Sequence, residues 1–378
     1  MSKSLFRRLS KKFFIISNFI VAILFLAGCY SKWFDPKQWW FLGVLNIAAF
    51  YFLVVLVMFA IFWVFLSPRW ILISAITILI SWQSVRNIFV FKLPYTFAKQ
   101  KAPDAIRVMS WNVAQFDVLN FPKTHDMFNQ MMGFINENQP DIACFQEVVC
   151  SDSVGKSFLR LSTILDSLHF PYYYYAYDNN ENWFGLNMHF GTMIFSKYPI
   201  IKKQQISHPP FSYNATFQYA DIVKDKDTLR VFNIHLQSLR FSKKNVSYIQ
   251  DESLQDKAKN LEETKSILSK LKTGIINRKT QADWIREEMQ KSPYRIMVCG
   301  DFNDVPNSYA YETIGENLQN AFEEKGFGIG RTFSGIAPNL RIDNIFLDKG
   351  YDVLQFTRIA RKLSDHFPII ADIRRSGQ

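Results

Sequence analysis

Acidic side chains are almost missing from the first 100 residues. Asp35 is the only one there, beside eleven Lys and Arg, whereas the rest of the chain holds 33 basic and 32 acidic side chains. The formal net charge of +11 therefore comes almost entirely from the N-terminal part. Positive charge beside apolar segments typically marks membrane topology. The electrically balanced remainder weakens the case for a duplex nucleic-acid footprint.

Paired cysteines are also missing. The four cysteines are Cys29, Cys144, Cys150 and Cys299, and they form no CxxC pair and no metal-ligand spacing. This pattern predicts buried free thiols rather than disulfides or a zinc site.

Charged residues are absent from three apolar runs, at 13–30, 39–66 and 70–85. The first two are long enough for a membrane-spanning helix, which needs about 20 residues. The third covers only about 24 Å as a helix. It needs snorkelling by Arg69 and Arg86, or local thinning of the bilayer, to span. We expect a membrane region at 1–92 with about three transmembrane helices.

The N-terminus is strongly basic, which predicts that it lies in the cytoplasm. Three crossings then place the rest of the chain outside the cytoplasm, as a multi-pass protein of the bacterial inner membrane. Two crossings would invert that answer. The stretch "LAGC" also permits a cleaved signal and a lipid anchor at Cys29, although two further apolar runs make such an anchor redundant. The basic residues are Lys3, Arg7, Arg8, Lys11 and Lys12.

Residues 93–104 repeat no hydrophobic period and contain two prolines, so we expect a linker there. From residue 105 onward, short runs rich in Ile, Val and Phe are each closed by polar residues, which is typical of strands. Helical periodicity separates them at 127–139 and 254–289, and this alternation predicts a layered α/β domain over 105–378. The runs are "AIRVMSWNV", "DIACFQEV", "GTMIFSKYPI", "LRVFNIHLQS", "RIMVCGDFND", "RIDNIFLD" and "FPIIADI".

Polar side chains recur where these runs end. They are Asn112, Glu147, His235, Asp301, Asn303, Asp343, Asp365 and His366. The stretches "SWNV", "QEV", "NIHLQS", "GDFND", "RIDNIF" and "SDHFPI" resemble the ordered motifs of the endonuclease/exonuclease/phosphatase superfamily, which includes DNase I-like nucleases, sphingomyelinases and inositol-phosphate phosphatases. The resemblance covers 106–373 and implies two packed β-sheets flanked by helices, a four-layer sandwich with its site where the strand ends converge. It names no substrate.

Glu147 ends an apolar strand, where an ionised carboxylate is costly unless it is paired or bound to a metal. Oxygen ligands of this kind suit Mg²⁺, with Mn²⁺ as the alternative ion. The resemblance makes Glu147 the principal metal ligand, places Asn112 beside it, and puts Asp365 at a second metal position. Without the other motifs, Glu147 would be read as a solvent-facing carboxylate and Asn112 as a turn residue.

Asp301 and Asn303 are two residues apart, so in an extended segment their side chains point the same way. The resemblance makes Asp301 the group that orients or deprotonates the attacking water. It makes Asn303 a donor to the phosphate or a completing metal ligand. The alternative is a Gly-Asp turn that merely stops a strand.

The resemblance also pairs Asp343 with His366 through a hydrogen bond. Such a carboxylate orients the imidazole and favours its protonated form, which stabilises the phosphate or assists the leaving oxygen. His235 matches the second histidine of the superfamily, a phosphate contact or proton donor. Trp111 and Asn344 stand where relatives often carry Tyr, and neither departure removes a residue of this chemistry.

These observations predict a membrane-anchored, divalent-metal-dependent phosphoesterase. Its substrate would be a phosphodiester, in nucleic acid or a phospholipid headgroup, or a phosphomonoester. The rival hypothesis is a catalytically silent binding module on the same fold, tethered to the membrane. Loss of a ligand or base would favour the rival, and none is lost.

Overall fold

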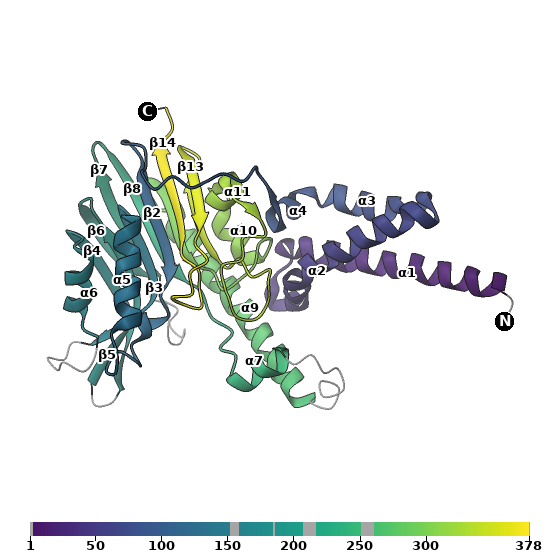
Figure 1. Cartoon of the computed structure of the whole chain (residues 1–378), viewed down its shortest axis with the longest axis horizontal. Helices are drawn as coiled ribbons and strands as arrows, with labels where there is room; N and C mark the ends of the chain where they lie inside the picture. The colour runs from purple at the N-terminus through teal and green to yellow at the C-terminus, as the bar shows by residue number, and fades with distance from the viewer. Residues whose placement is uncertain (1–2, 152–158, 184–185, 207–216, 251–260, 378) are drawn as a thin grey trace.

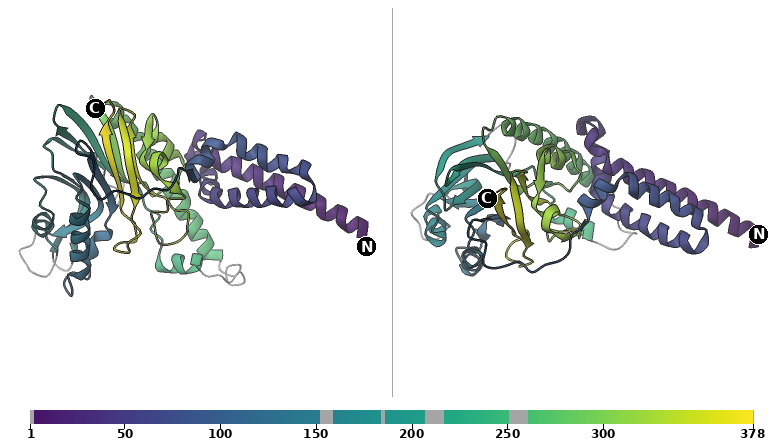
Figure 2. Two further views of the ribbon diagram at one scale, coloured as in Figure 1. Left: turned by 45° about the horizontal axis from the view of Figure 1, so that its top comes forward. Right: turned by 90° about the horizontal axis from the view of Figure 1, so that it is seen from above.

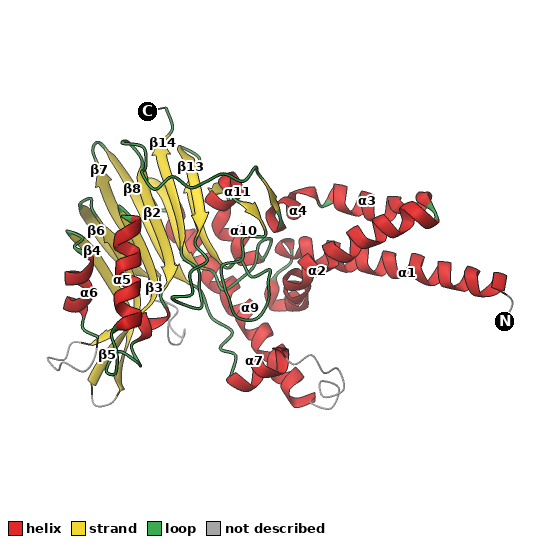
Figure 3. Ribbon diagram, in the orientation of Figure 1, coloured by secondary structure: helices red, strands yellow, loops and turns green. Residues whose placement is uncertain are grey.

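Two six-stranded sheets pack face to face in the part of the molecule away from the N-terminal helices (Figures 1 and 3). The computed structural model describes residues 3–151, 159–183, 186–206, 217–250 and 261–377. One sheet has the order β10 (Leu318–Asn320), β12 (Asp343–Asp348), β9 (Arg295–Asp301), β8 (Asp227–His235), β7 (Phe217–Lys224) and β6 (Ile200–Ile206). The other has the order β13 (Tyr351–Arg358), β14 (Ile369–Arg375), β2 (Ile106–Asn112), β3 (Ile142–Ser151), β5 (Leu186–Ser196) and β4 (Tyr172–Trp183).

All seven predicted strands are present, and the predicted fold class is confirmed. The sandwich has three cores, one between the sheets and one under the helices on each outer face, and each strand can serve two of them because its successive residues face opposite sides of the sheet. In β2, Val108 lies in the core between the sheets, whereas Met109 and Trp111 lie in the core beneath the outer helices. The pairs β2–β3 and β8–β9 are parallel, and the other described strand pairs are antiparallel.

Helices cover both outer faces of the sandwich (Figure 2). The amphipathic α5 (Asp126–Asn138) and α6 (Leu161–Leu168) pack on one sheet. The other sheet is covered by α9 (Leu261–Gln290) and α10 (Tyr309–Gly315), with α11 (Ala321–Lys325) nearby. The short α7 (Lys243–Gln250) precedes α9. Both predicted helical stretches are present, although the first seven residues of 254–289 lie outside the described residues.

The N-terminal helices project from the sandwich, with the N-terminus at their far tip (Figure 1). The two helices α1 (Lys3–Cys29) and α2 (Pro36–Leu66) are long and apolar enough to cross a membrane. The third apolar run begins with a short 3-10 turn and continues as α3 (Ile71–Ile80) and α4 (Trp82–Ile88). A bend of 75° separates α3 from α4. If that bent pair is one span, three helices cross.

The helices dock directly on the sandwich. The side-chain amide of Asn46 in α2 donates to the carbonyl of Pro306 at 3.2 Å, and that of Asn87 in α4 donates to Asn307 Oδ1 at 2.9 Å. After α4, β1 (Val90–Phe91) pairs with β11 (Phe327–Gly328). Residues 93–104 then run along the sandwich without helix or strand. The four cysteines are buried and free, as predicted.

Candidate active site

The predicted polar residues gather at one edge of the sandwich because β8 and β9 are parallel and β12 runs opposite to them. His235 and Asp301 end their strands side by side, and Asp343, which begins β12, is opposite Asp301. Asn112 ends β2 in the facing sheet, next to Glu147 of β3. Strand ends that are far apart in the sequence therefore meet at one place.

Gly300 allows β9 to lie unusually close to β8 just before Asp301. Its φ is +149°, and a Cβ atom there would lie 2.0 Å from the carbonyl oxygen of Ile234. The prediction that Asp301 and Asn303 point the same way assumed an extended backbone between them. The strand ends at Asp301, and Asn303 has a φ of 49°, so this assumption is wrong. Asp301 Oδ1 accepts from the Asn303 amide N–H at 2.8 Å, and both residues line the same cavity.

Glu147 sits at a β-bulge, where the register of β3 against β5 shifts between Phe145 and Val148. Its φ of 55° is in the left-handed region, which bulky residues rarely adopt. A bulge re-aims a side chain, and here it turns the carboxylate toward the facing sheet. The amide N–H₂ of Asn112 bridges the two carboxylates, at 3.2 Å from Glu147 Oε1 and 3.0 Å from Asp301 Oδ2. The Asn112 side-chain oxygen accepts from the Ala114 N–H.

These carboxylates are strongly desolvated. Burial raises the pKa of Asp301 to about 6, with Asp343 adding to the rise and the imidazoles of His366 and His235 opposing it. Burial also raises the pKa of Glu147, against the hydrogen bond from Asn112. About a quarter of the Glu147 side chain (24%) nevertheless stays accessible. An anionic pair held out of water in this way favours an added cation.

Asp343 and His366 form the predicted pair, with His366 Nδ1 at 2.9 Å and 3.2 Å from the two Asp343 oxygens. Burial lowers the pKa of His366, but Asp343 and Asp301 overcome that effect and raise it to about 10. His366 is therefore held as an imidazolium. The indole N–H of Trp111 donates to the His366 carbonyl at 3.0 Å, so this departure from the usual Tyr positions the histidine backbone.

The other two predicted residues flank this centre. His235 is buried, and its Nε2 lies 3.5 Å from Glu147 Oε1 and 3.6 Å from Asp301 Oδ2. Asp365 is exposed at the rim of the cavity. Its backbone carbonyl accepts two hydrogen bonds from Ser334, which fix the loop that carries His366.

The donor set fits a hard divalent cation. Asp301, Asp343 and His366 offer buried ligand atoms within 4.8 Å of one another. Asp343 and His366 already hydrogen-bond each other at 2.9 Å, whereas the nearest imidazole nitrogens lie 3.5 Å from Glu147 and 3.6 Å from Asp301. Mg²⁺ is usually held in proteins by one or two carboxylates, with waters and substrate phosphates as its other ligands.

Two features of the site were not predicted. Arg278 of α9 is fully buried and lines the cavity, where its Nε donates to Asp304 at 3.0 Å and its Nη1 to the Gln237 carbonyl at 3.1 Å. Below the site, Gln146 of β3 donates to Asn233 of β8 at 2.7 Å and ties the two sheets together. Gln146 and Asn233 belong to the motifs "QEV" and "NIH", so the sequence offered a signal for this pair. Nothing in the sequence distinguishes Arg278 from the other basic residues of its long helix.

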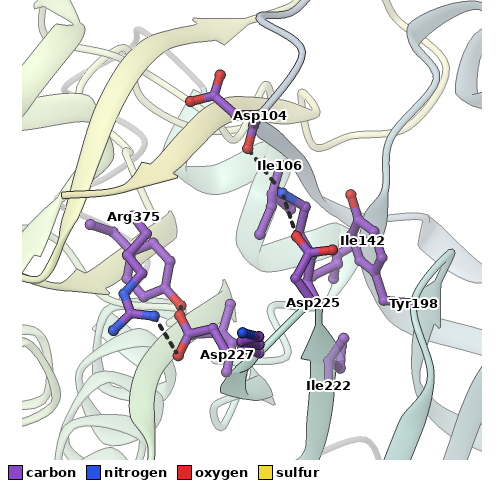
Figure 4. A pocket seen from close by; sticks show the side chains of 12 residues that line it. Asp104, Ile106, Ile142, Tyr198, Ile222, Asp225, Asp227 and Arg375 are labelled. Carbon is purple, nitrogen blue, oxygen red and sulfur yellow. Dashed lines mark hydrogen bonds and ion pairs between the residues drawn. The ribbon is translucent and has the colours of Figure 1, made fainter. Parts of the chain in front are cut away.

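A second cavity lies at the opposite end of the strands (Figure 4). Its polar groups bond one another: the Tyr351 hydroxyl donates to Asp227 at 2.7 Å, and Lys224 donates to the Asp104 carbonyl at 3.0 Å. Arg375 lies 3.8 Å from the same Asp227. These polar groups of the cavity are therefore already paired with one another.

Comparison with known proteins agrees with this geometry. A profile of the endonuclease/exonuclease/phosphatase family matches residues 109–366. A second profile, for a domain of unknown function, matches residues 11–88. No curated protein matches the chain by sequence.

A solved structure with a TM-score above 0.5 shares the fold of the sandwich. It is an endonuclease/exonuclease/phosphatase from Beutenbergia cavernae, with 17% identity, a TM-score of 0.53 and 72% of each chain covered. Humanized D. rerio TDP2 has 15% identity and a TM-score of 0.49, with 72% of this chain and 99% of that chain covered. A family protein from Leptotrichia buccalis has 16% identity and a TM-score of 0.49, with 71% of this chain and 100% of that chain covered. The family profile spans most of the chain and includes all eight predicted site residues, and the chain belongs to the endonuclease/exonuclease/phosphatase family.

Proposed function

We propose that this chain is a membrane-anchored, Mg²⁺-dependent phosphoesterase. The observation that carries the proposal is the meeting of Glu147 and Asp301 with the Asp343–His366 pair at one edge of the sandwich. Glu147 is the principal metal ligand in this proposal, and Asp365 is the ligand at a second metal position. Asn112, whose amide nitrogen faces both carboxylates, keeps them at a fixed separation and turns its oxygen to the ion only if the amide rotates.

A bound Mg²⁺ would supply Lewis-acid polarisation of a phosphoryl oxygen. Asp301 accepts the proton of the attacking water, which its raised pKa makes favourable near neutral pH. The imidazolium of His366 and the amide of Asn303 donate to the phosphoryl oxygens as negative charge develops. His235, between Glu147 and Asp301, contacts the phosphate or gives a proton to the leaving oxygen.

The full-length chain, purified in detergent, is expected to hydrolyse bis(4-nitrophenyl) phosphate with Mg²⁺ or Mn²⁺. Because the ion polarises the phosphoryl group, its removal by EDTA should lower the rate at least about a hundredfold, and added Mg²⁺ should restore it. The measurement is nitrophenolate release at a series of free Mg²⁺ concentrations. Hydrolysis that EDTA leaves unchanged would overturn the metal dependence, and no hydrolysis with either ion would favour the silent binding module.

The proposed topology places the catalytic domain on the side of the membrane away from the N-terminus. The two ends of α1 support this: Lys11 donates to Ser67 between α2 and α3, and the Tyr30 hydroxyl donates to the Ile80 carbonyl at the end of α3. The α3 segment therefore runs alongside α1, from the level of Lys11 to the level of Tyr30. In this proposal the membrane is the bacterial inner membrane and the domain is extracytoplasmic.

A phosphatase reporter fused after Lys101 is expected to be active in the periplasm, because an odd number of crossings follows a cytoplasmic N-terminus. The measurement compares alkaline phosphatase and a cytoplasmic reporter at the same junction. A fusion after Ser67, between the second and third runs, is the matched control with the opposite expectation. A Lys101 fusion that is active only in the cytoplasm would show two crossings.

A further inference from the structure

The cavity that contains Asp301 and His366 has a volume of about 510 Å³ and is lined mainly by apolar side chains. They come from the loop after β8, from α7 and α9, from the loop before β12, and from α2. We call this surface the apolar wall. Its members are Ile47, Leu239, Phe241, Ile249, Leu271 and Ile336. Phosphate chemistry alone gives no reason for a hydrocarbon surface beside the carboxylates.

One member of the wall belongs to a helix that can cross the membrane. Ile47 is in α2, and Trp39 and Trp40 lie near the end of α2 that meets the sandwich, where indole rings favour the membrane interface. Ile47 follows Trp40 by seven residues, which is about 10 Å along a helix. The cavity therefore reaches a helix that is long and apolar enough to cross a membrane.

The position of α2 against the cavity is fixed by contacts. Asn339 donates to the Ile47 carbonyl at 3.2 Å and accepts from the Tyr51 hydroxyl at 3.3 Å. Gly43 faces Ile275 of α9 so closely that a Cβ atom there would lie 3.0 Å from the isoleucine side chain. These contacts hold the cavity against α2.

The charges around the cavity suit a lipid headgroup better than a nucleic-acid strand. Among the described lining residues, Arg240 and Arg278 are the only Lys or Arg, and Arg278 is already paired with Asp304. A strand of nucleic acid needs a basic track and stacking platforms along several nucleotides. Outside the cavity, Lys272 of α9 lies over the Trp40 ring at 5.6 Å, where a basic side chain meets anionic headgroups.

We propose that the site hydrolyses a membrane lipid phosphoester, with the phosphate at Asp301 and His366 and a hydrocarbon chain along the apolar wall toward Ile47. This inference rests on the proposed function and names its substrate class. In the reaction, the oxygen of one water bonds to phosphorus and the ester P–O bond to the leaving group breaks. The proton of the water ends on the leaving oxygen or on solvent.

The test uses 4-nitrophenyl alkyl phosphates that differ only in the alkyl chain, methyl against octyl, with the full-length chain in maltoside micelles and Mg²⁺. The apolar wall should raise kcat/KM for the octyl ester at least about tenfold over the methyl ester, because each methylene removed from water favours binding. A ratio near one would overturn the proposal. A single-stranded oligonucleotide cleaved with a higher kcat/KM than the octyl ester would assign the site to nucleic acid instead.

Micelles take up long-chain esters even without the protein, which alone could raise the rate with the octyl ester. Matched variants on α9 distinguish this uptake from binding of the alkyl chain to the apolar wall. Leu271→Gln replaces a member of the apolar wall, and the octyl-to-methyl ratio should fall to less than about a third of its wild-type value. Leu268→Gln, three residues earlier on an exposed position outside the cavity, should keep the wild-type ratio. An equal octyl-to-methyl ratio in the two variants would show that the alkyl chain of the substrate does not lie on the apolar wall.

A binding measurement keeps the inference distinct from the proposed function. If no ester is hydrolysed, the proposed function fails, and the apolar wall is judged by thermal melting with octylphosphonate and methylphosphonate. The octyl compound should raise Tm more than the methyl compound in the wild type and in Leu268→Gln, but not in Leu271→Gln. Equal shifts by the two phosphonates in the wild type would overturn the lipid assignment.

Discussion

Replacing Asp343 and His366 together with alanine is expected to lower kcat/KM little more than the worse single replacement does. The reason is that His366 Nδ1 bonds both Asp343 oxygens, and this carboxylate holds the imidazole charged and in place. If each single change costs about three decades, independent roles would cost about six in the double variant. If the two residues act as one unit, the second replacement removes a function that is already lost, so we expect the double variant to lose about three to four decades of kcat/KM.

The measurement is a double-mutant cycle on kcat/KM with bis(4-nitrophenyl) phosphate, and the coupling it reports is the departure from additivity. Thermal melting of each variant shows whether the fold survives, since both residues are buried. Asp343→Asn is the conservative companion: it keeps the size of the side chain and removes the charge that favours imidazolium. Fully additive losses would show that Asp343 only begins its strand and does not act through His366.

The fold was predictable because strand signals are local. The runs of β2, β3 and β9 carry their apolar residues and their polar ends within a few positions, and the order of their motifs pointed to the sandwich. The Asp343–His366 contact could be expected only through the family resemblance. Sequence spacing says nothing of which strand ends lie side by side.

Other parts of the site depend on packing between segments that are distant in the sequence. Arg278 reaches the cavity only because α9 crosses from β8 to β9 over the outer face of the sheet. Glu147 lies at a β-bulge, and no residue in "FQEVV" is of a type that would predict one. Asn46 offered a usable signal, because a side-chain amide inside an apolar run is costly in a membrane unless a partner satisfies it. That partner is the carbonyl of Pro306.

The contacts of Asn46 and Asn87 join the N-terminal helices to the loop that follows β9. The loop that begins at Asp301 and Asn303 continues through Pro306 and Asn307, whose backbone and side chain accept from these two amides. Asn307 also donates to the Ser84 carbonyl at 3.1 Å. The helices therefore help to position the loop, in addition to the membrane anchoring that we propose for them.

Glu147→Gln is expected to lower turnover at least about a hundredfold and to raise the Mg²⁺ concentration needed for half-maximal rate. Glutamine keeps the shape of the side chain and its hydrogen bond from Asn112 but removes the negative charge that a cation needs. In a pocket where burial already raises the pKa of this carboxyl, loss of that charge removes the main reason for the ion to enter. The same variant should weaken the rise in Tm that Mg²⁺ produces in the wild type.

The measurement is a Mg²⁺ titration followed both by nitrophenolate release and by thermal melting. Glu137→Gln is the matched control, because Glu137 is an exposed carboxylate of α5 whose nearest cation, Arg361, lies 3.5 Å away at the surface. Such a pair contributes little, so turnover and the Mg²⁺ midpoint should stay at their wild-type values. Unchanged turnover of Glu147→Gln at limiting Mg²⁺ would show that another carboxylate holds the ion, and Asp301 would be the next residue to replace, since it is buried and shares the Asn112 amide.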